Sequence, residues 1–282
     1  KPDTWYPVAL AEKIAGTDLN ETTDFDIIAS FNSEFSNWYL GTDGQAVSQF
    51  DLVTVVLHEL GHGLGFISGE AFDDTNNTAR WDLQETGFPM IFTTYLEDQN
   101  GNNILEVENN SETLADFLTS NNVFVNNDLV VQNNGSPAKV FSPSPYDAGS
   151  SISHWNEATF NNTENALMTP SVAPSEVIHH PGINTLSFFA EMGWFRTDIS
   201  HEPILIADDA SPLDFDIDVL SDTTLIDESF SLNYFYEGGD TTRLLLSELE
   251  AGKYSTRIDL DASKAGLFYY FDGLSDALNK NY

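Results

Sequence analysis

The residue types best suited to chemistry stand together at His58, Glu59 and His62, which spell H-E-x-x-H. Positions four apart on an α-helix lie about 40° from each other around the axis and roughly 6 Å apart along it. Two imidazoles placed in this way can bind one metal ion, and the adjacent glutamate can act as a general base. The spacing therefore predicts a hydrolytic zinc site; the alternative is a chance match on a core helix.

Apolar residues just before His58 predict the helix that must position this motif. They surround the helix on nearly all sides, which indicates a buried element. Asp51 alone, or Ser48 with Asp51 as a Ser-x-x-Asp box, is suited to begin the helix. Glycines crowd its far end from Gly61 onward. Because glycine is a poor helix former, we expect the chain to leave the helix right after His62.

The two helical histidines do not complete a zinc site. A catalytic zinc takes three protein ligands and keeps one position open for water, so one further ligand is needed. If that ligand is an imidazole, the candidates are His154, His179, His180 and His201. A carboxylate, Glu70 or Glu85, is the other option.

The segment from His58 to Phe66 resembles the metzincin clan of zinc peptidases, whose signature is H-E-x-x-H-x-x-G-x-x-H. Gly65 matches the glycine of that signature, but Ser68 stands where the clan has its third histidine. One metzincin family, the leishmanolysins, carries a long insertion after the glycine, and then Ser-His-Trp and Leu-Met-x-Pro segments.

This chain has both later segments, Ser153-His154-Trp155 and Leu167-Met168-Thr169-Pro170. The resemblance covers residues 24–196. Leishmanolysins of eukaryotic parasites are rich in disulfides and this chain has no cysteine, so it is similar to a cysteine-free bacterial branch.

The resemblance implies a role for each matching residue. His154 would be the third zinc ligand, Glu59 the general base, and Met168 the hydrophobic base beneath the metal. A strand around Ile28 and Ala29 would pair with an extended substrate peptide. The loop that carries His179 and His180 would border the pocket for the residue after the scissile bond, so these histidines could touch substrate.

We expect an α+β protein with two domains. Residues 1–198 would form the metzincin-like protease domain, with a mixed sheet, the active-site helix and an insertion at 67–150 before the third ligand. Residues 199–282 contain repeated short β-rich runs separated by glycine turns, which predict a small all-β, immunoglobulin-like sandwich. Further helices are expected at 8–14, 111–120 and 184–192. Further strands are expected at 24–32, 123–125, 129–131, 139–141, 204–207, 213–219, 230–236, 242–249, 254–260 and 267–271.

Composition narrows the classes of partner. The 282 residues include 10 Lys and Arg against 45 Asp and Glu, a formal charge of −35. Such a surface repels nucleic acid and anionic membranes, and allows Ca²⁺ sites as well as Zn²⁺. The sequence has no apolar run of about 20 residues, so we expect no membrane span. Oligomeric state is not predicted.

The expected function is a secreted, zinc-dependent endopeptidase with protein or peptide substrates, extracellular and bacterial. The start at Lys1, without a signal peptide, is what a mature or trimmed chain would show. One alternative is a zinc-containing adhesin or pseudoenzyme that binds a partner through the sandwich. Another is a zinc amidase that acts on cell-wall peptides.

Overall fold

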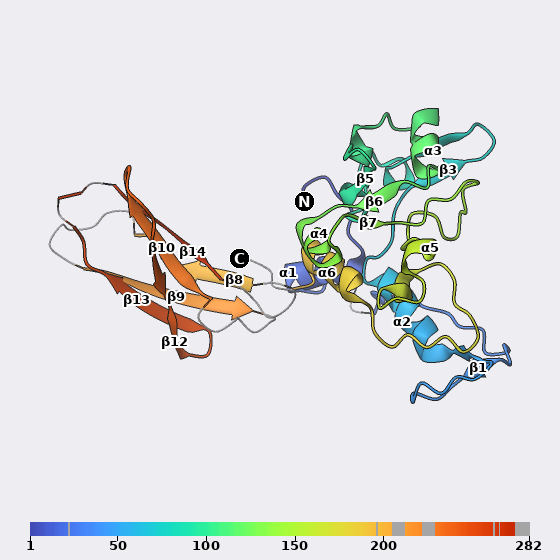
Figure 1. The fold of residues 1–282 in the computed structure, drawn as a ribbon, viewed down its shortest axis with the longest axis horizontal. Helices are drawn as coiled ribbons and strands as arrows, with labels where there is room; N and C mark the ends of the chain where they lie inside the picture. Colours follow the sequence, from blue (N-terminus) through green and yellow to red (C-terminus); the bar gives the residue numbers. More distant parts are fainter. Residues whose placement is uncertain are drawn as a thin grey trace. The chain divides into compact units, whose positions relative to one another are not determined.

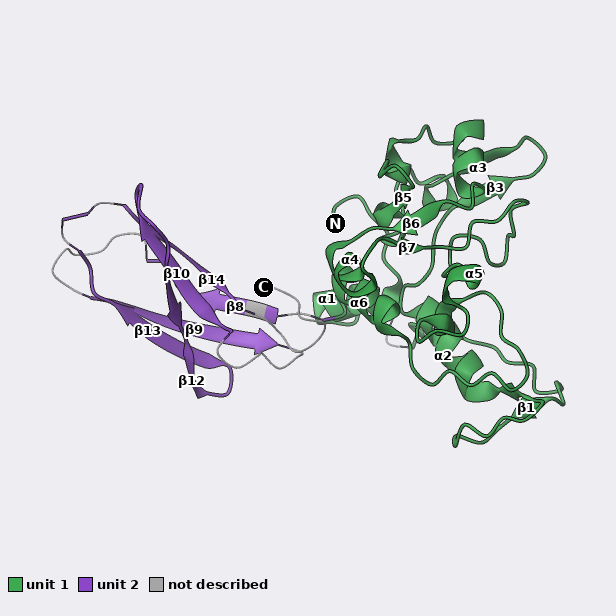
Figure 2. Cartoon of the chain, viewed as in Figure 1, with its two compact units in different colours: residues 1–194 green, residues 195–282 purple. Residues whose placement is uncertain are grey.

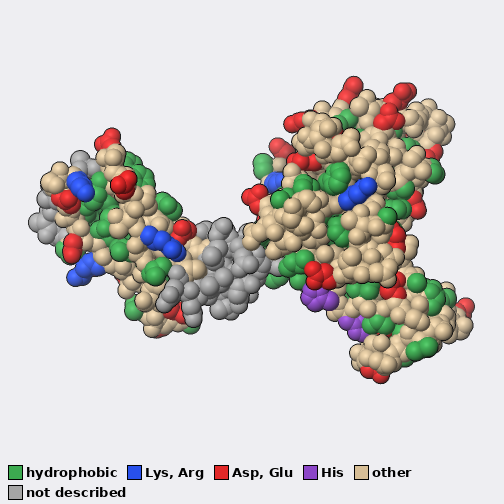
Figure 3. All heavy atoms as spheres, in the orientation of Figure 1, with side chains coloured by type: hydrophobic (Ala, Val, Ile, Leu, Met, Phe, Trp, Pro, Cys, Tyr) green, Lys and Arg blue, Asp and Glu red, His purple; other side chains and the backbone are tan. Residues whose placement is uncertain are grey.

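The computed structural model describes residues 1–21, 23–195, 197–204, 212–221, 229–261, 263–264 and 266–273. It shows a mixed α+β protein made of two compact units, residues 1–194 and 195–282 (Figures 1 and 2). The boundary expected from the sequence lies slightly later, after residue 198. No helix within the described ranges is both long and apolar enough to cross a bilayer. Acidic side chains are scattered over the visible face of both units (Figure 3).

Unit 1 contains the six α-helices of the described chain. Each begins or ends at a residue that satisfies the free backbone groups of the terminus. Ser111 and Asn127 accept hydrogen bonds from the backbone amides of Leu114 and Val130, and Gly193 ends the last helix at a positive φ of 117°. The helices are α1 (Val8–Ala15), α2 (Leu52–Gly63), α3 (Glu112–Leu118), α4 (Asp128–Asn134), α5 (Glu157–Phe160) and α6 (Ile183–Met192).

The sheets of unit 1 are small. They are the parallel pair β1 (Trp38–Tyr39) and β2 (Phe50–Asp51), the hairpin of β3 (Ala71–Asp73) and β4 (Thr78–Arg80), and an antiparallel sheet in the order β5 (Leu96–Asp98), β6 (Val123–Val125), β7 (Ala138–Lys139). Single 3₁₀ turns lie between these elements: η1 (Leu83–Glu85), η2 (Thr93–Tyr95), η3 (Ile104–Glu106) and η4 (Ala166–Met168).

An aromatic cluster fills the core of unit 1. Phe66, which follows α2, lies edge-on to Phe92, Trp155 and Phe188, with ring centroids 5.1, 4.7 and 5.8 Å away. The indole of Trp155 is fully buried and donates a hydrogen bond to Thr185 Oγ1 at 3.0 Å. Because Trp155 is adjacent to His154 in the chain, this core fixes the backbone that carries that histidine.

Unit 2 consists of two antiparallel sheets. One has the order β12-β13-β9-β8 and the other the order β11-β10-β14. Side chains of β9 alternate strictly between buried and exposed, as expected for a strand with one face on a core. Phe215, Leu232 and Ile258 bring both sheets into that core. The strands are β8 (Thr197–His201), β9 (Leu213–Ser221), β10 (Ser231–Tyr236), β11 (Thr242–Leu245), β12 (Ser247–Glu250), β13 (Lys253–Ile258) and β14 (Leu267–Asp272).

Most expected helices and strands are confirmed. The mixed sheet expected in the first domain is not found within the described residues, where unit 1 has one parallel and two antiparallel small sheets. Three single elements also differ from expectation. The expected strand at 24–32 is irregular backbone, with Phe25 and Ile28 about three-quarters exposed (76% and 77%), because its apolar side chains have no sheet to pack on. The expected strand at 129–131 lies in α4, which begins where Asn127 caps the helix. The α2 helix is not buried all round: only Thr54 and Gly61 are fully buried in it.

One expectation falls largely outside the described residues. A strand was expected at 204–207, and residues 205–207 are not among those described.

Candidate metal centre

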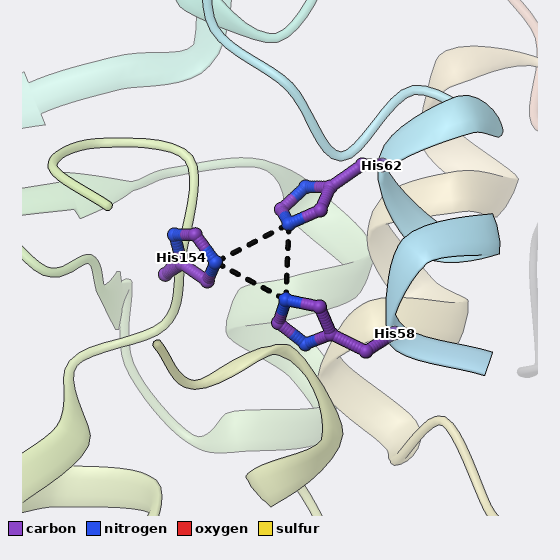
Figure 4. Close-up of side chains that lie close together, drawn as sticks. All are labelled: His58, His62 and His154. Atoms are coloured by element: carbon purple, nitrogen blue, oxygen red, sulfur yellow. Dashed lines mark hydrogen bonds between the residues drawn. The ribbon is translucent and has the colours of Figure 1, made fainter. Parts of the chain in front are cut away.

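Three imidazoles converge in unit 1. His58 and His62 project from successive turns of α2, and His154 reaches them from a loop of the later chain (Figure 4). The Nε2 atoms of His58 and His62 are 3.1 Å apart, and His154 Nε2 lies 3.2 Å from each. Within the described part of the chain, this is the one cluster of three or more His, Asp or Glu residues close enough to share a metal ion.

Each ring is held from behind by a backbone carbonyl. The Nδ1 atoms of His58, His62 and His154 lie 2.7 Å from the carbonyl oxygens of Leu167, Phe66 and Ser150 respectively. A carbonyl can only accept, so every Nδ1 carries the proton and every neutral ring presents an unprotonated Nε2. Such outer contacts fix both tautomer and orientation of metal-binding histidines.

This arrangement fits a metal ion. Three Nε2 lone pairs face one another at 3.1–3.2 Å, where they repel unless a cation lies between them. A tetrahedral zinc with Zn–N bonds of about 2.0–2.1 Å places its nitrogen ligands about 3.3 Å apart. The three imidazoles leave a fourth position for another ligand, which is the composition of catalytic rather than structural zinc sites.

Burial keeps the imidazoles of His62 and His154 neutral. It lowers the pKa of His62, and it lowers the pKa of His154 to about 3, with the neighbouring His62 as the next cause. A proton is thereby removed as a competitor for the lone pairs at neutral pH, and neutral imidazole is the form that binds metal.

The side chain of Met168 lies directly under the helix. Met168 is fully buried in the η4 turn, and its backbone carbonyl accepts a hydrogen bond from Trp155 N at 2.8 Å. Its neighbour Leu167 supplies the carbonyl that orients His58. The η4 turn therefore contacts His58 and Gly61 of α2 on one side and the backbone of Trp155, next to His154, on the other.

A narrow cavity lies beside His58 and Glu59. Its volume is about 140 Å³, and Glu59 is exposed at the surface of the helix there. Its walls come from α2, from the η4 turn and from the chain that follows this turn: Thr54, Val55, His58, Glu59, Ala166, Leu167, Thr169, Pro170, Ser171, Val172 and Ile178. A larger polar cavity of about 490 Å³ lies around β3 and β4, and none of the three histidines lines it.

The other residues singled out from the sequence lie elsewhere. His179 Nε2 lies 2.7 Å from Asp51 Oδ2, and His180 Nδ1 accepts a hydrogen bond from Gly182 N. His201 belongs to unit 2, where its ring packs on Phe215.

The two carboxylates considered as ligands do not join the imidazoles. Glu85 pairs with Arg80 at 2.8 Å, and the carboxyl of Glu70 is buried away from the histidines in a place where burial raises its pKa. Ile28 and Ala29 are exposed on irregular backbone.

Sequence reasoning missed a contact between Ser68 and the loop of the third histidine. Ser68 N donates to Ser153 Oγ at 3.0 Å, and the two hydroxyl oxygens lie 2.9 Å apart. Ser68 occupies the position where the contiguous signature has a histidine, and it contacts the residue that precedes His154. The sequence shows that Ser68 departs from the signature, but it does not show that Ser68 hydrogen-bonds to Ser153.

Comparison with known proteins gives two partial matches. Residues 4–136, slightly less than half of the chain, match a family model described as SPBPB7E8-like. A stretch of 65 residues is 34% identical to an uncharacterized protein of Schizosaccharomyces pombe, covering 23% of this chain and 11% of that protein. The matched stretch thus spans about a tenth of the relative's length. The family match contains His58 and His62 and ends before His154.

Proposed function

We propose that this chain is a zinc-dependent endopeptidase that cleaves peptide bonds. The observation that supports it most is the convergence of three Nε2 atoms, each with its tautomer fixed by a carbonyl, beside an exposed glutamate and a cavity. Three imidazoles with one open position and an adjacent carboxylate are the requirements of metal-assisted hydrolysis.

The zinc would be held by His58, His62 and His154. When bound, the ion would polarise the scissile carbonyl and make a water molecule more acidic. Glu59 follows His58 on α2 and lines the same cavity, so its carboxylate is placed to take the proton of the attacking water. The same carboxyl then delivers that proton to the leaving amine. Three carbonyl-bound Nδ1 atoms keep the imidazoles oriented throughout.

The cavity beside Glu59 would receive a substrate side chain. Its walls include the apolar side chains of Val55, Leu167, Val172 and Ile178, which favour an apolar residue. By the resemblance to metzincins, this is the residue after the scissile bond.

The proposed function also assigns a fold type to each unit and a location to the protein. Unit 1 would be a metzincin domain of the leishmanolysin type, with Met168 as the base under the metal. Unit 2 would be an immunoglobulin-like sandwich, and the protein would be secreted, with proteins or peptides as substrates. An adhesin with a structural zinc, or an amidase acting on cell-wall peptides, is the competing outcome of the test below.

The test is digestion of denatured casein by the zinc-loaded protein, with the cut sites mapped by mass spectrometry. Glu59→Gln is the matched control because it keeps the side chain's shape and removes the base. We expect cuts within the polypeptide by the natural sequence and none by the variant. Equal, negligible cleavage by both proteins at one zinc per chain would overturn the proposal.

A further inference from the structure

The segment that follows Met168 returns to the start of α2 and is fastened there. We call residues 170–181 the pocket loop, since several of its residues line the cavity. Ser175 N donates to the carbonyl of Gln49 at 2.8 Å, and Ser48 N donates to Ser175 Oγ at 2.8 Å. Three residues further on, Ile178 N donates to Thr54 Oγ1 at 2.8 Å.

Asp51 lies at the place where residues 178 and 179 of the pocket loop bind to the start of α2. Its side chain is fully buried, and Oδ2 accepts hydrogen bonds from Thr54 N at 2.8 Å, Thr54 Oγ1 at 2.8 Å and His179 Nε2 at 2.7 Å. Burial opposes its ionisation, but the bonds from His179 and Thr54 outweigh burial and hold the pKa of Asp51 below its usual range. Asp51 is therefore a buried carboxylate, a group that is costly without close donors.

His179 contributes the donor that comes from the pocket loop. Its side chain is 30% exposed and its Nε2 is directed at Asp51, which also caps the helix that carries His58 and Glu59. Ile178, the preceding residue, lines the cavity on one side, and Thr54 and Val55 of α2 line it on another. The contact between His179 and Asp51 thus joins two walls of the same cavity.

We propose that Asp51 and His179 are positioning residues that set the width of the substrate cavity and so determine which side chain it accepts. This role rests on the proposed function. Neither residue takes part in the reaction: they act by holding Ile178 at a fixed distance from α2. Without His179 the carboxylate of Asp51 loses its donor from the loop, and the contacts between Ile178 and Thr54 remain to hold the cavity wall in this region.

Two variants separate positioning from a general loss of structure. His179→Ala removes the donor, whereas His179→Gln places an amide N–H where it can reach Asp51. Glu176→Gln is the control for a change within the pocket loop, because its amide oxygen can still accept the bond that Ala173 N makes to the carboxylate.

The first readout is selectivity. Peptides that differ only in the residue after the scissile bond, Ala against Leu or Phe, are compared by kcat/KM. A well-shaped apolar pocket discriminates by about 10–200-fold. We expect His179→Ala to reduce the discrimination by about tenfold, mainly through KM, and His179→Gln and Glu176→Gln to stay within about threefold of the natural sequence. Unchanged selectivity in His179→Ala would overturn the proposal.

The second readout does not require catalysis. Hydrogen–deuterium exchange of the zinc-loaded protein is followed in peptides from residues 170–181 and from α2. We expect faster exchange in the pocket loop of His179→Ala, with unchanged zinc content and unchanged exchange at α2 beyond its first turn. If the natural sequence cleaves no peptide, the proposed function fails, and the exchange data still decide whether the contact between His179 and Asp51 fastens the pocket loop. Equal protection of the loop in both proteins would refute that role.

Discussion

Gly61 of α2 leaves no room for a side chain above Met168. A Cβ atom at position 61 would lie 2.4 Å from the sulfur of Met168 and 3.0 Å from its terminal methyl carbon. The glycine therefore lets the helix that carries His58 and His62 pack directly on a buried methionine. With a Cβ atom at position 61, either the helix or the methionine side chain would have to shift. Glycine is used here for close approach, at some cost in helix propensity.

This contact predicts strong coupling between positions 61 and 168. Met168→Ala should lower the free energy of unfolding by about 2–5 kcal/mol, because it opens a cavity in the core. Gly61→Ala should cost about 1–3 kcal/mol through overpacking. In the double variant the new methyl group enters the space left by the methionine, so the total should fall short of the sum by at least about 1 kcal/mol. Urea unfolding of the four proteins measures the coupling, and additive effects would show that the two side chains do not compete for space.

Replacing the proposed base should separate catalysis from metal binding. Glu59→Ala is expected to abolish peptide cleavage while zinc stays near one per chain, because Glu59 is absent from the cluster formed by the three imidazoles. Zinc content by elemental analysis and peptidase rate are measured on the same preparation. Loss of the metal in this variant would place Glu59 among the ligands and end its assignment as base.

Removing the third imidazole should weaken metal binding severely. Loss of an outer partner of a ligand costs about 10–100-fold in affinity, so loss of the ligand itself in His154→Ala should exceed about 100-fold. Competition with a chromophoric chelator gives the affinity. His201→Ala, which changes a histidine of unit 2, should leave the zinc affinity unaltered. Equal zinc affinities in the two variants would exclude His154 from the site.

The buried carboxyl of Glu70 predicts a pH-dependent stability. Burial raises its pKa in the folded state, so the folded protein retains a proton that the unfolded chain releases above about pH 4.3. The unfolded chain then binds fewer protons, and this residue destabilises the protein increasingly as pH rises from that value towards the raised folded pKa. Glu70→Gln should remove this contribution.

The stability difference between Glu70→Gln and the natural sequence should therefore grow in favour of the variant from about pH 4 upward. Urea titrations at several pH values, all with bound zinc, provide the measurement. Parallel stability curves would mean that Glu70 titrates alike in both states.

The parts of the site that sequence could predict depend on local spacing. The helix over 52–63, its cap at Asp51 and the juxtaposition of His58 with His62 follow from a periodic pattern and a start signal. His154 was one of four candidate histidines until the resemblance singled it out, and Met168 was identified through the resemblance alone. Nothing local to Ser153-His154-Trp155 shows that this segment returns to α2. Tertiary packing brings such distant segments together, and here Trp155 packs against Phe66, which follows α2.

The wrong predictions of secondary structure also arise because contacts with other parts of the chain decide the local structure. Residues 24–32 have strand-like composition, but they find no pairing partner in the described chain and stay irregular. Residues 129–131 also read as a strand, yet Asn127 supplies a cap and Gly135 a left-handed end, and the helix forms instead. That His179 could touch substrate stays a prediction; the sequence did not predict its hydrogen bond to Asp51, which lies 128 positions earlier in the chain. No local pattern encodes such a pairing.

The carbonyl-oriented imidazoles have a consequence for the durability of the molecule. The sequence has no cysteine, and a metal ion shared by His62 and His154 would tie together points 92 positions apart. Because the unfolded chain holds no such preformed site, the free energy of metal binding would add to the stability of the folded protein. Such a link would form and break with the supply of metal rather than with redox conditions. A chelator would then lower the stability of the fold in the same step in which it removes the proposed activity.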